Sequence, residues 1–270
     1  MAVLVQQNLQ TLHKRGVKTI GPASGFLACG DTGSGRMSEP AEIVEAIVSV
    51  LCPVKDMEGL KVLVTAGPTV ERIDPVRYLT NDSSGKMGYA LAQAAQLRGA
   101  NVTLVSGPVH LSAPSGVKVV PVTSTMNLYD RMMELCETQD IIVQAAAPAD
   151  YRVEKPADQK IKKQAGESLT LTLVENPDIA KAVGQRKQPG QILVGFAAET
   201  QHVLENAQQK LSKKNLDLIV ANDVTAAGAG FGVDTNIVTL ITKESTDSLP
   251  MLTKREVADR IWDRALQLRS

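Results

Sequence analysis

From Lys61 onward, the chain alternates between short apolar runs and longer segments with helical periodicity, and this alternation constrains the fold more than any other feature. Strands are predicted at 61–65, 101–106, 117–122, 140–146, 191–196, 216–221 and 236–242. Helices are predicted after Lys86 and near 125–137, 201–214 and 254–268. Because alternating strands and helices build parallel sheets covered on both faces, the pattern predicts a doubly wound, mostly parallel, Rossmann-like α/β fold.

Two segments depart from this alternation. Between 151 and 176 a polar stretch is followed by an alternating run at 168–174, which predicts an antiparallel arm that covers a site or reaches a partner. Residues before about 53 form a separate block, with helices predicted near 5–14 and 42–51, a strand near 17–20 and a Gly-rich loop at 29–36. We therefore predict two parts, 1–53 and 54–270.

Composition limits the classes of function. Basic and acidic residues both number 29, so no overall field attracts nucleic acid or anionic lipid, and no nucleic-acid partner is expected. The three cysteines are scattered without metal-ligand spacing, which predicts neither a disulfide framework nor a zinc site. The sequence also lacks a signal-peptide pattern and an apolar run long enough to span a membrane, so a cytoplasmic protein with no membrane partner is expected.

One stretch predicts phosphate binding. The first strand leads into Gly67 and, after a long loop, into the residues NDSSGKMG at 81–88, which open a helix. A Gly- and Ser-rich turn at a helix N-terminus points N–H groups at one spot and favours an anion there, although an ordinary capped turn explains the residues equally well. Two other phosphate motifs are excluded, because Met87 replaces the Ser or Thr of a Walker A loop and the GxGxxG fingerprint of NAD enzymes is missing.

Other polar residues follow later strands. Asp150 stands just beyond the strand at 140–146, where it can hold a divalent cation or cap a turn. Asn176 and Pro177 predict a helix start, with Asn as the N-cap and Pro at the first helical position. Lys210 and Lys214 lie on one helix face, where they either bind an anion or remain solvated. The same two alternatives hold for the lysines at 160–163 on the arm.

Taken together, the segments TAGPT, DPVRYLTNDSSGKMG, KIKKQ, NPDI, GFAAET and LIVANDV resemble the ligase half of the bacterial bifunctional phosphopantothenoylcysteine decarboxylase/phosphopantothenate-cysteine ligase family. The similarity covers nearly all of 61–268. It implies an enzyme of coenzyme A biosynthesis that joins 4'-phosphopantothenate to L-cysteine through an acyl-cytidylate made from CTP, with Mg²⁺, as a homodimer. One departure, Pro148 where the family more often has a small residue, leaves Asp150 in place.

The resemblance also implies roles for individual residues. Lys160 supports cytidylylation, whereas Asn81 and Arg77 serve the acyl intermediate and its conversion. The expected substrate contacts surround the phosphate-binding turn: Gly67, Ser83, Ser84, Gly85 and Lys86. The expected CTP contacts are Gln144, Ala145, Ala146, Asp150, Lys160, Pro177, Asp178, Ile179, Ala180, Phe196, Lys210 and Lys214. Asp150 is also the expected metal ligand.

Residues 4–50 resemble the end of the decarboxylase half, a flavodoxin-like domain, in which the pattern PASGxxACG followed by GRM forms a substrate loop. Cys29 matches the proton donor of that loop, although a lone Cys is more often inert. The upstream flavin-binding segments and the catalytic His have no match in this sequence, so FMN is expected only in an intact bifunctional protein, and decarboxylase activity is not expected. Two alternatives to a ligase are an NAD(P) oxidoreductase, which would bind nicotinamide cofactor without CTP, and a regulatory subunit without turnover.

Overall fold

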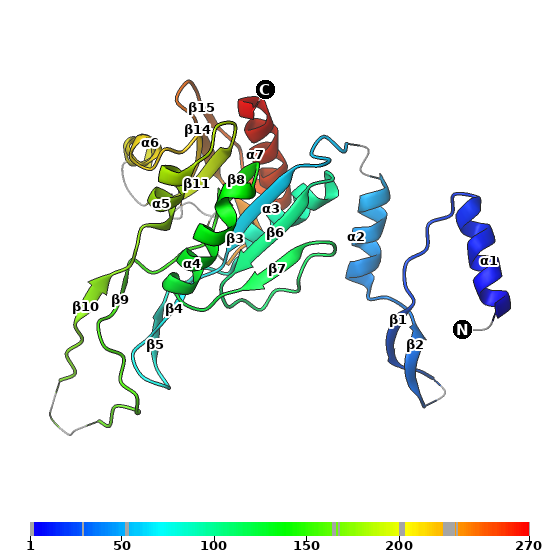
Figure 1. Cartoon of the computed structure of the whole chain (residues 1–270), viewed down its shortest axis with the longest axis horizontal. Coiled ribbons are helices and arrows are strands. Elements are labelled where there is room, and N and C mark those ends of the chain that lie inside the picture. The colour runs from blue at the N-terminus through cyan, green and yellow to red at the C-terminus, as the bar shows by residue number, and fades with distance from the viewer. Residues whose placement is uncertain are drawn as a thin grey trace. The chain divides into compact units, whose positions relative to one another are not determined.

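A computed structural model describes residues 3–28, 30–51, 54–163, 166, 168–199, 203–223, 230 and 232–269. The chain divides into two compact units, residues 1–54 and 55–270, which are described separately. Figure 1 follows the chain from one terminus to the other.

The first unit contains two helices and one hairpin. Its elements are α1 (Val3–Lys14), β1 (Ala23–Phe26), β2 (Thr32–Arg36) and α2 (Pro40–Leu51). Both helices agree with the sequence patterns, but the predicted strand at 17–20 is wrong, because these residues have no partner strand and are irregular. The predicted loop at 29–36 is also wrong in part: Thr32–Arg36 pairs antiparallel with β1, and that partner outweighs the low strand preference of its glycines.

The second unit is built on an eight-stranded sheet with the order β15-β14-β12-β11-β8-β3-β6-β7. Its strands are β3 (Lys61–Ala66), β6 (Asn101–Ser106), β7 (Lys118–Pro121), β8 (Ile141–Gln144), β11 (Ile192–Glu199), β12 (Leu218–Asp223), β14 (Val238–Ile241) and β15 (Thr246–Ser248). The six strands from β7 to β12 are parallel, and β14 and β15 add an antiparallel edge. The predicted doubly wound, mostly parallel fold is confirmed.

Helices cover both faces of this sheet (Figure 1). On one face, α3 (Lys86–Leu97) and α7 (Lys254–Arg269) bury Leu91 and Trp262 against Val64 and its neighbours. The second apolar core contains residues of α4 (Thr125–Leu135), the short helix η1 (Cys136–Thr138), α5 (Ile179–Arg186) and α6 (Val203–Lys213). Within the described residues, no helix combines the length and apolar character that crossing a membrane requires.

Three small antiparallel pairs stand beside the main sheet. They are β4 (Val70–Arg72) with β5 (Tyr78–Thr80), β9 (Tyr151–Val153) with β10 (Leu173–Glu175), and β13 (Thr235–Asn236) with β16 (Leu252–Thr253). The predicted antiparallel arm therefore exists and spans residues 151–175, but its paired strands are only three residues long. The hairpin β4–β5 lies where the sequence predicts a loop, because its three-residue strands depend on pairing with each other and on contacts with distant loops, such as Val70 N–H with the Thr123 carbonyl oxygen.

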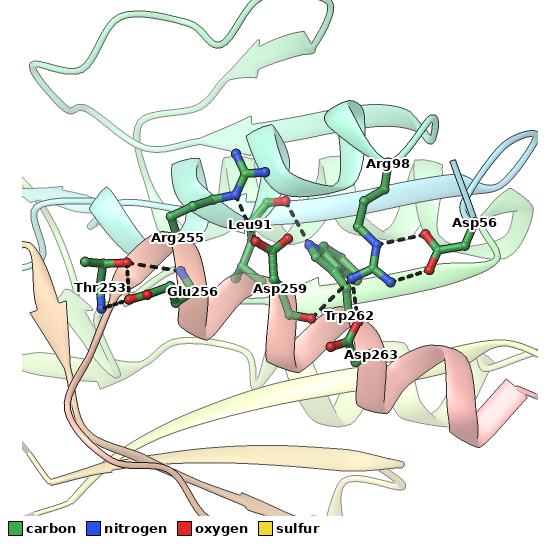
Figure 2. A network of polar contacts seen from close by, with 9 residues as sticks. All are labelled: Asp56, Leu91, Arg98, Thr253, Arg255, Glu256, Asp259, Trp262 and Asp263. Atoms are coloured by element: carbon green, nitrogen blue, oxygen red, sulfur yellow. Dashed lines mark hydrogen bonds and ion pairs between the residues drawn. The ribbon is translucent and has the colours of Figure 1, made fainter. Parts of the chain in front are cut away.

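The contact between α3 and α7 is fixed by two polar side chains (Figure 2). The Trp262 ring is fully buried, and its Nε1–H donates to the carbonyl oxygen of Leu91 at 3.1 Å. The side chain of Arg98 is only 7% exposed and donates to both oxygens of Asp56 and to Asp263 at 2.8 Å. These bonds connect the segment before β3, the end of α3 and the middle of α7.

Candidate active site

The order of the parallel strands places a crevice at one edge of the sheet. After β3 the chain continues to β6 on one side, and after β8 it continues to β11 on the other, so the strand order reverses between β3 and β8. The loops after these two strands meet, because Ala147 N–H donates to the carbonyl oxygen of Gly67 at 2.9 Å. Ligands of open α/β sheets bind at the carboxyl ends of the strands where the order reverses.

A cavity of about 530 Å³ opens at this edge, within the size range of small-molecule sites. Nine residues predicted to contact CTP lie in its wall: Gln144, Asp150, Pro177, Asp178, Ile179, Ala180, Phe196, Lys210 and Lys214. They come from the end of β8, the loop before β9, the start of α5, β11 and the end of α6. Asn176, which the sequence offers as a possible anion or base contact, also lies in the wall. Residues that sequence reasoning missed complete it: Pro148, Ala149, Tyr151, Glu175, Gly195, Leu216 and Ile219.

The wall of this cavity carries both signs of charge. The Lys214 ammonium pairs with Asp178 at 3.0 Å, and the other Asp178 oxygen accepts from Lys181 N–H as the N-cap of α5. The sequence-based N-cap, Asn176, is therefore wrong by two residues. Asn176 instead accepts from Arg152 and donates to the Ala149 carbonyl, which fixes the loop on the opposite side of the cavity.

One polar group in this wall has no partner. The side-chain nitrogen Nε2 of Gln144 is buried and makes no hydrogen bond within the part of the chain that the structure describes. A buried donor without an acceptor costs roughly 1–3 kcal/mol, so a ligand that offers an acceptor here restores the missing bond. The cavity can therefore hold a polar ligand of nucleotide size.

A second, smaller hollow of about 60 Å³ lies at the N-terminus of α3. Predicted substrate contacts Ser83, Ser84, Gly85 and Lys86 line it, together with Ala145 and Phe196, and Phe196 also lines the larger cavity. Gly85 is the N-cap of α3 with φ of 76° and has no side chain, whereas the Lys86 N–H donates to the hydroxyl of Ser84 at 3.5 Å. A helix N-terminus favours an anion, because its first N–H groups carry the positive end of the helix dipole.

Glycines let α3 approach the sheet closely at this point. A Cβ at Gly88 would lie 2.5 Å from the Cβ of Ala66 and 2.8 Å from the carbonyl oxygen of Thr65. A Cβ at Gly85 would lie 3.4 Å from the Cα of Gly67, which places Gly67 directly beside the helix start. Any larger residue at Gly88 would push the helix start away from β3.

Lys86 engages a neighbouring loop. Its ammonium donates to Asp234 at 2.7 Å and to the carbonyl oxygen of Gly232 at 2.9 Å. These contacts lower the pKa of Asp234 below its ordinary value, mainly through the hydrogen bond. The buried Lys254 donates to three carbonyl oxygens of the same loop, those of Gly230, Val233 and Thr235. Burial, followed by the charge of Lys86, lowers the pKa of Lys254.

The hollow also contains two asparagines that sequence reasoning missed, Asn222 and Asn236. Asn222 is 92% buried, and its Oδ1 accepts no hydrogen bond from the described residues. The motif LIVANDV contains Asn222 at the end of β12, so its position at a strand end was a usable signal. The hollow is thus lined both by the first residues of α3 and by an acceptor that no described residue uses.

The three residues predicted to act in catalysis lie at this edge or on the arm. The amide of Asn81 donates to the carbonyl oxygens of Ala147 at 3.0 Å and Pro148 at 3.2 Å, which connects the loop after β5 with the loop after β8. Arg77 binds Asp74 and the Ile161 carbonyl oxygen, and Lys160 is exposed on the arm. None of the three side chains, Asn81, Arg77 or Lys160, lines either hollow.

The remaining predicted residues fall in different places. Ala146 N–H donates to the Thr65 hydroxyl at 3.1 Å, which connects the segment after β8 with the end of β3. Asp150 is exposed at the rim of the larger cavity, and no cluster of three metal-ligating side chains occurs among the described residues. Cys29 lies outside the described residues.

The fold and this edge define a Rossmann-like protein with a crevice at the carboxyl edge of its sheet. The model of the DNA/pantothenate metabolism flavoprotein C-terminal domain matches residues 57–268, and a flavoprotein model matches residues 1–52. The chain belongs to the DNA/pantothenate metabolism flavoprotein C-terminal domain family, which confirms the resemblance seen in its motifs.

Relatives and solved structures agree with this assignment. The chain is 49% identical to the coenzyme A biosynthesis bifunctional protein CoaBC of Vibrio cholerae over 96% of its own length and 65% of the relative. It is 47% identical to the protein of the same name from Bacillus subtilis over 95% of its own length and 64% of the relative. The chain therefore spans about 65% of these relatives.

Two solved structures have the same fold. The crystal structure of the C-terminal domain of a coenzyme A biosynthesis bifunctional protein CoaBC is similar with a TM-score of 0.65 and 41% identity, over 77% of this chain and 94% of that structure. The DNA/pantothenate metabolism flavoprotein from Streptococcus pneumoniae has a TM-score of 0.66 at 24% identity, over 77% of this chain and 99% of that structure, and supports the fold alone.

Proposed function

We propose that this chain is a phosphopantothenate-cysteine ligase that uses CTP in coenzyme A biosynthesis. The observation that carries the proposal is the pair of hollows that share Phe196 at the carboxyl edge of the sheet, one of nucleotide size and one at the N-terminus of α3. Two adjacent hollows suit a reaction that joins a nucleotide to a phosphorylated acid. The family membership and the names of the relatives point to the same pathway.

The reaction has two steps. A carboxylate oxygen of 4'-phosphopantothenate attacks the α-phosphorus of CTP and expels pyrophosphate, which gives an acyl-cytidylate. The amine of L-cysteine then attacks the acyl carbon, loses a proton and expels CMP, which gives 4'-phosphopantothenoylcysteine. We assign CTP to the larger cavity and the phosphate of phosphopantothenate to the N-terminus of α3.

Different side chains act in the two reaction steps. Lys160 offsets the negative charge that builds on the α-phosphate during the first step. Asn81 holds the loop after β8 in place and orients the acyl group for the amine in the second step, with Arg77 nearby in the chain. Lys210 and Lys214 face the triphosphate from α6.

A magnesium ion fits the donor set at the rim of the larger cavity. Mg²⁺ is held in such sites by one or two carboxylates together with substrate phosphates, and the exposed Asp150 supplies one carboxylate at the rim, whereas both oxygens of Asp178 already bind Lys214 and the Lys181 N–H. When bound, the ion supplies additional positive charge to the triphosphate. We also propose that the ligase is a homodimer, which agrees with the exposed apolar residues Tyr151, Leu169 and Leu173 of the arm.

The first unit has a different proposed origin. Residues 1–52 match a flavoprotein model, and we propose that they are the end of a flavin-dependent decarboxylase domain. FMN then belongs to an intact bifunctional protein, and Cys29 takes no part in ligation.

One incubation tests the proposal. The protein is mixed with phosphopantothenate, L-cysteine, CTP and Mg²⁺, and CMP, pyrophosphate and the coupled thiol product are measured by mass. Equimolar formation of all three is expected. Binding of a nicotinamide cofactor without binding of CTP, or no turnover with any nucleotide, would overturn the assignment.

A further inference from the structure

The carboxylate of Asp74 connects two segments that are distant in the sequence. Asp74 lies in the turn between β4 and β5, and its side chain is completely buried. Its Oδ1 accepts from the N–H groups of Val76 and Arg77, both at 2.8 Å. Its Oδ2 accepts from the Arg77 guanidinium at 3.2 Å and from the N–H of Ile161 at 3.1 Å. Both oxygens are therefore fully used.

Only half of this arrangement is needed to form the turn. An Asp that accepts N–H groups two and three residues ahead with one oxygen already closes such a turn. The second oxygen reaches across to the arm, and Arg77 completes the contact by donating to the carbonyl oxygen of Ile161 at 3.2 Å. The peptide groups on both sides of Ile161 are thus bound by one ion pair.

A second contact strengthens this attachment. The N–H of Ala157 in the arm donates to the carbonyl oxygen of Ile73 at 2.9 Å, directly beside Asp74. The burial of Asp74 opposes its ionisation, but the N–H groups of Val76, Ile161 and Arg77 outweigh it and keep the pKa of Asp74 below its ordinary value. The carboxylate therefore stays charged and retains its four hydrogen bonds at neutral pH.

We propose that Asp74 is a positioning residue for Lys160. Asp74 holds the Ile161 peptide group against the β4–β5 hairpin, and Lys160 directly precedes Ile161, so the backbone from which the exposed Lys160 ammonium extends is fixed. The structural part of the proposal stands by itself, whereas its consequence for catalysis rests on the proposed ligase function. A lysine carries four flexible methylene groups, and a fixed backbone limits the volume that its ammonium samples.

Asp74→Asn tests the contact with a change of one atom. The amide keeps one acceptor for the turn but turns an NH₂ group toward two donors, Arg77 and the Ile161 N–H, so the arm is released. Trypsin cleavage after Lys162 and Lys163 should become about tenfold faster, because loss of such hydrogen bonds raises the open population by that order. Asp158→Asn, the same change at an exposed arm residue, should leave the cleavage rate as it is in the unchanged protein.

Ile161→Pro tests the same contact from the arm and leaves the hairpin residues unchanged. Proline removes the N–H that Asp74 accepts, and Thr170→Pro at an exposed arm position is the matched control. Ile161→Pro should accelerate cleavage after Lys162 and Lys163 in the same way, even if Asp74→Asn proves too unstable to study. Unchanged cleavage in Ile161→Pro, or equal acceleration in the control, would overturn the attachment.

Step-resolved kinetics test the consequence for Lys160. In Asp74→Asn and Ile161→Pro, pyrophosphate release should fall about tenfold in kcat, whereas KM for CTP should change less than twofold, because the CTP cavity does not contain these residues. Faster trypsin cleavage with normal pyrophosphate release would show that Asp74 does not position Lys160. If the unchanged protein releases no pyrophosphate, the ligase assignment fails, and the trypsin comparison still decides the attachment.

Discussion

The α3–α7 face and the carboxyl edge of the sheet use polar side chains in opposite ways. On the α3–α7 face, buried polar groups are paired within the chain: Trp262 binds Leu91, and Arg98 lies between two aspartates (Figure 2). At the carboxyl edge, Gln144 Nε2 and Asn222 Oδ1 are buried without a partner among the described residues. A face that only stabilises the fold satisfies its own hydrogen bonds, whereas a binding edge leaves some for its ligand.

This difference predicts that stability and activity respond to separate sets of substitutions. Changes on the α3–α7 face should lower the free energy of unfolding while the folded fraction keeps its turnover. Changes at the carboxyl edge and on the arm should slow particular reaction steps at nearly constant stability.

The largest effect is expected for Trp262→Ala. Trp262 is the only tryptophan of the chain and is fully buried on the side of α7 that contacts α3, so its truncation leaves a large cavity and removes its hydrogen bond to the Leu91 carbonyl oxygen. The free energy of unfolding should fall by about 3–5 kcal/mol. Urea unfolding followed by circular dichroism measures it, because the variant has no tryptophan fluorescence. Leu268→Ala on the exposed side of α7 is the control, and an equal loss there would contradict the comparison.

Lys160→Gln should have the largest effect on activity. Gln resembles Lys in length but carries no charge, so the attack on the α-phosphate loses its cation, and pyrophosphate release should fall about a hundredfold or more. The urea midpoint should not change, because the side chain is exposed. Lys155→Gln changes the same charge elsewhere on the arm and serves as the control. A normal rate of pyrophosphate release in Lys160→Gln would remove this lysine from the mechanism.

Asn81→Asp should separate the two reaction steps. The substitution replaces a donor with a carboxylate that faces the carbonyl oxygens of Ala147 and Pro148, so the loop after β8 shifts, and the negative charge opposes the bound phosphate. Consumption of the acyl-cytidylate by cysteine should slow about tenfold, the order expected for a lost hydrogen bond. Samples quenched at successive times and analysed by mass should show the intermediate accumulate.

The control for Asn81→Asp is Asp82→Asn, the reverse change at the next residue. It should not accumulate intermediate. Conversion of the intermediate at the original rate in Asn81→Asp would exclude Asn81 from the second step.

The smallest effect concerns the pH dependence of the stability that the α3–α7 face contributes. Hydrogen bonds from Arg98 hold the pKa of Asp56 below its ordinary value, and burial opposes this only in part. Asp56 therefore contributes stability above its pKa in the unfolded chain, about 3.9, and this contribution disappears as the pH falls through the lower pKa of the folded state. Since Asp56 is 38% exposed, the contribution is only about 1 kcal/mol or less.

Urea midpoints at pH 6 and pH 3 test this contribution. The difference between the two midpoints should be smaller in Asp56→Asn than in the unchanged protein. An identical difference in both proteins would show that the Arg98 pair contributes nothing to acid unfolding.

Most regular elements of the second unit could be predicted because their periodicity is local. The strand Asn101–Ser106 has the predicted bounds, α4 and α7 begin at the predicted residues, and α3 begins at Lys86, directly before the predicted start. Elements that depend on a partner strand were harder to predict. The segment at 17–20 pairs with no described strand and is irregular, whereas Thr32–Arg36 forms a strand in spite of its glycines. The N-cap of α5 is Asp178 because Asn176 is used by Arg152 and Ala149 instead.

The sequence by itself determined the fold class and the edge at which the polar residues gather. Alternating strands and helices fix a parallel sheet, and residues that follow parallel strands must meet at its carboxyl edge. Only the tertiary structure decided what each side chain contacts there. Lys86 binds Asp234 across 148 residues, and Asp74 binds Ile161 across 87 residues. Such contacts depend on the packing of loops over the sheet, and the periodicity of the chain carries no information about that packing.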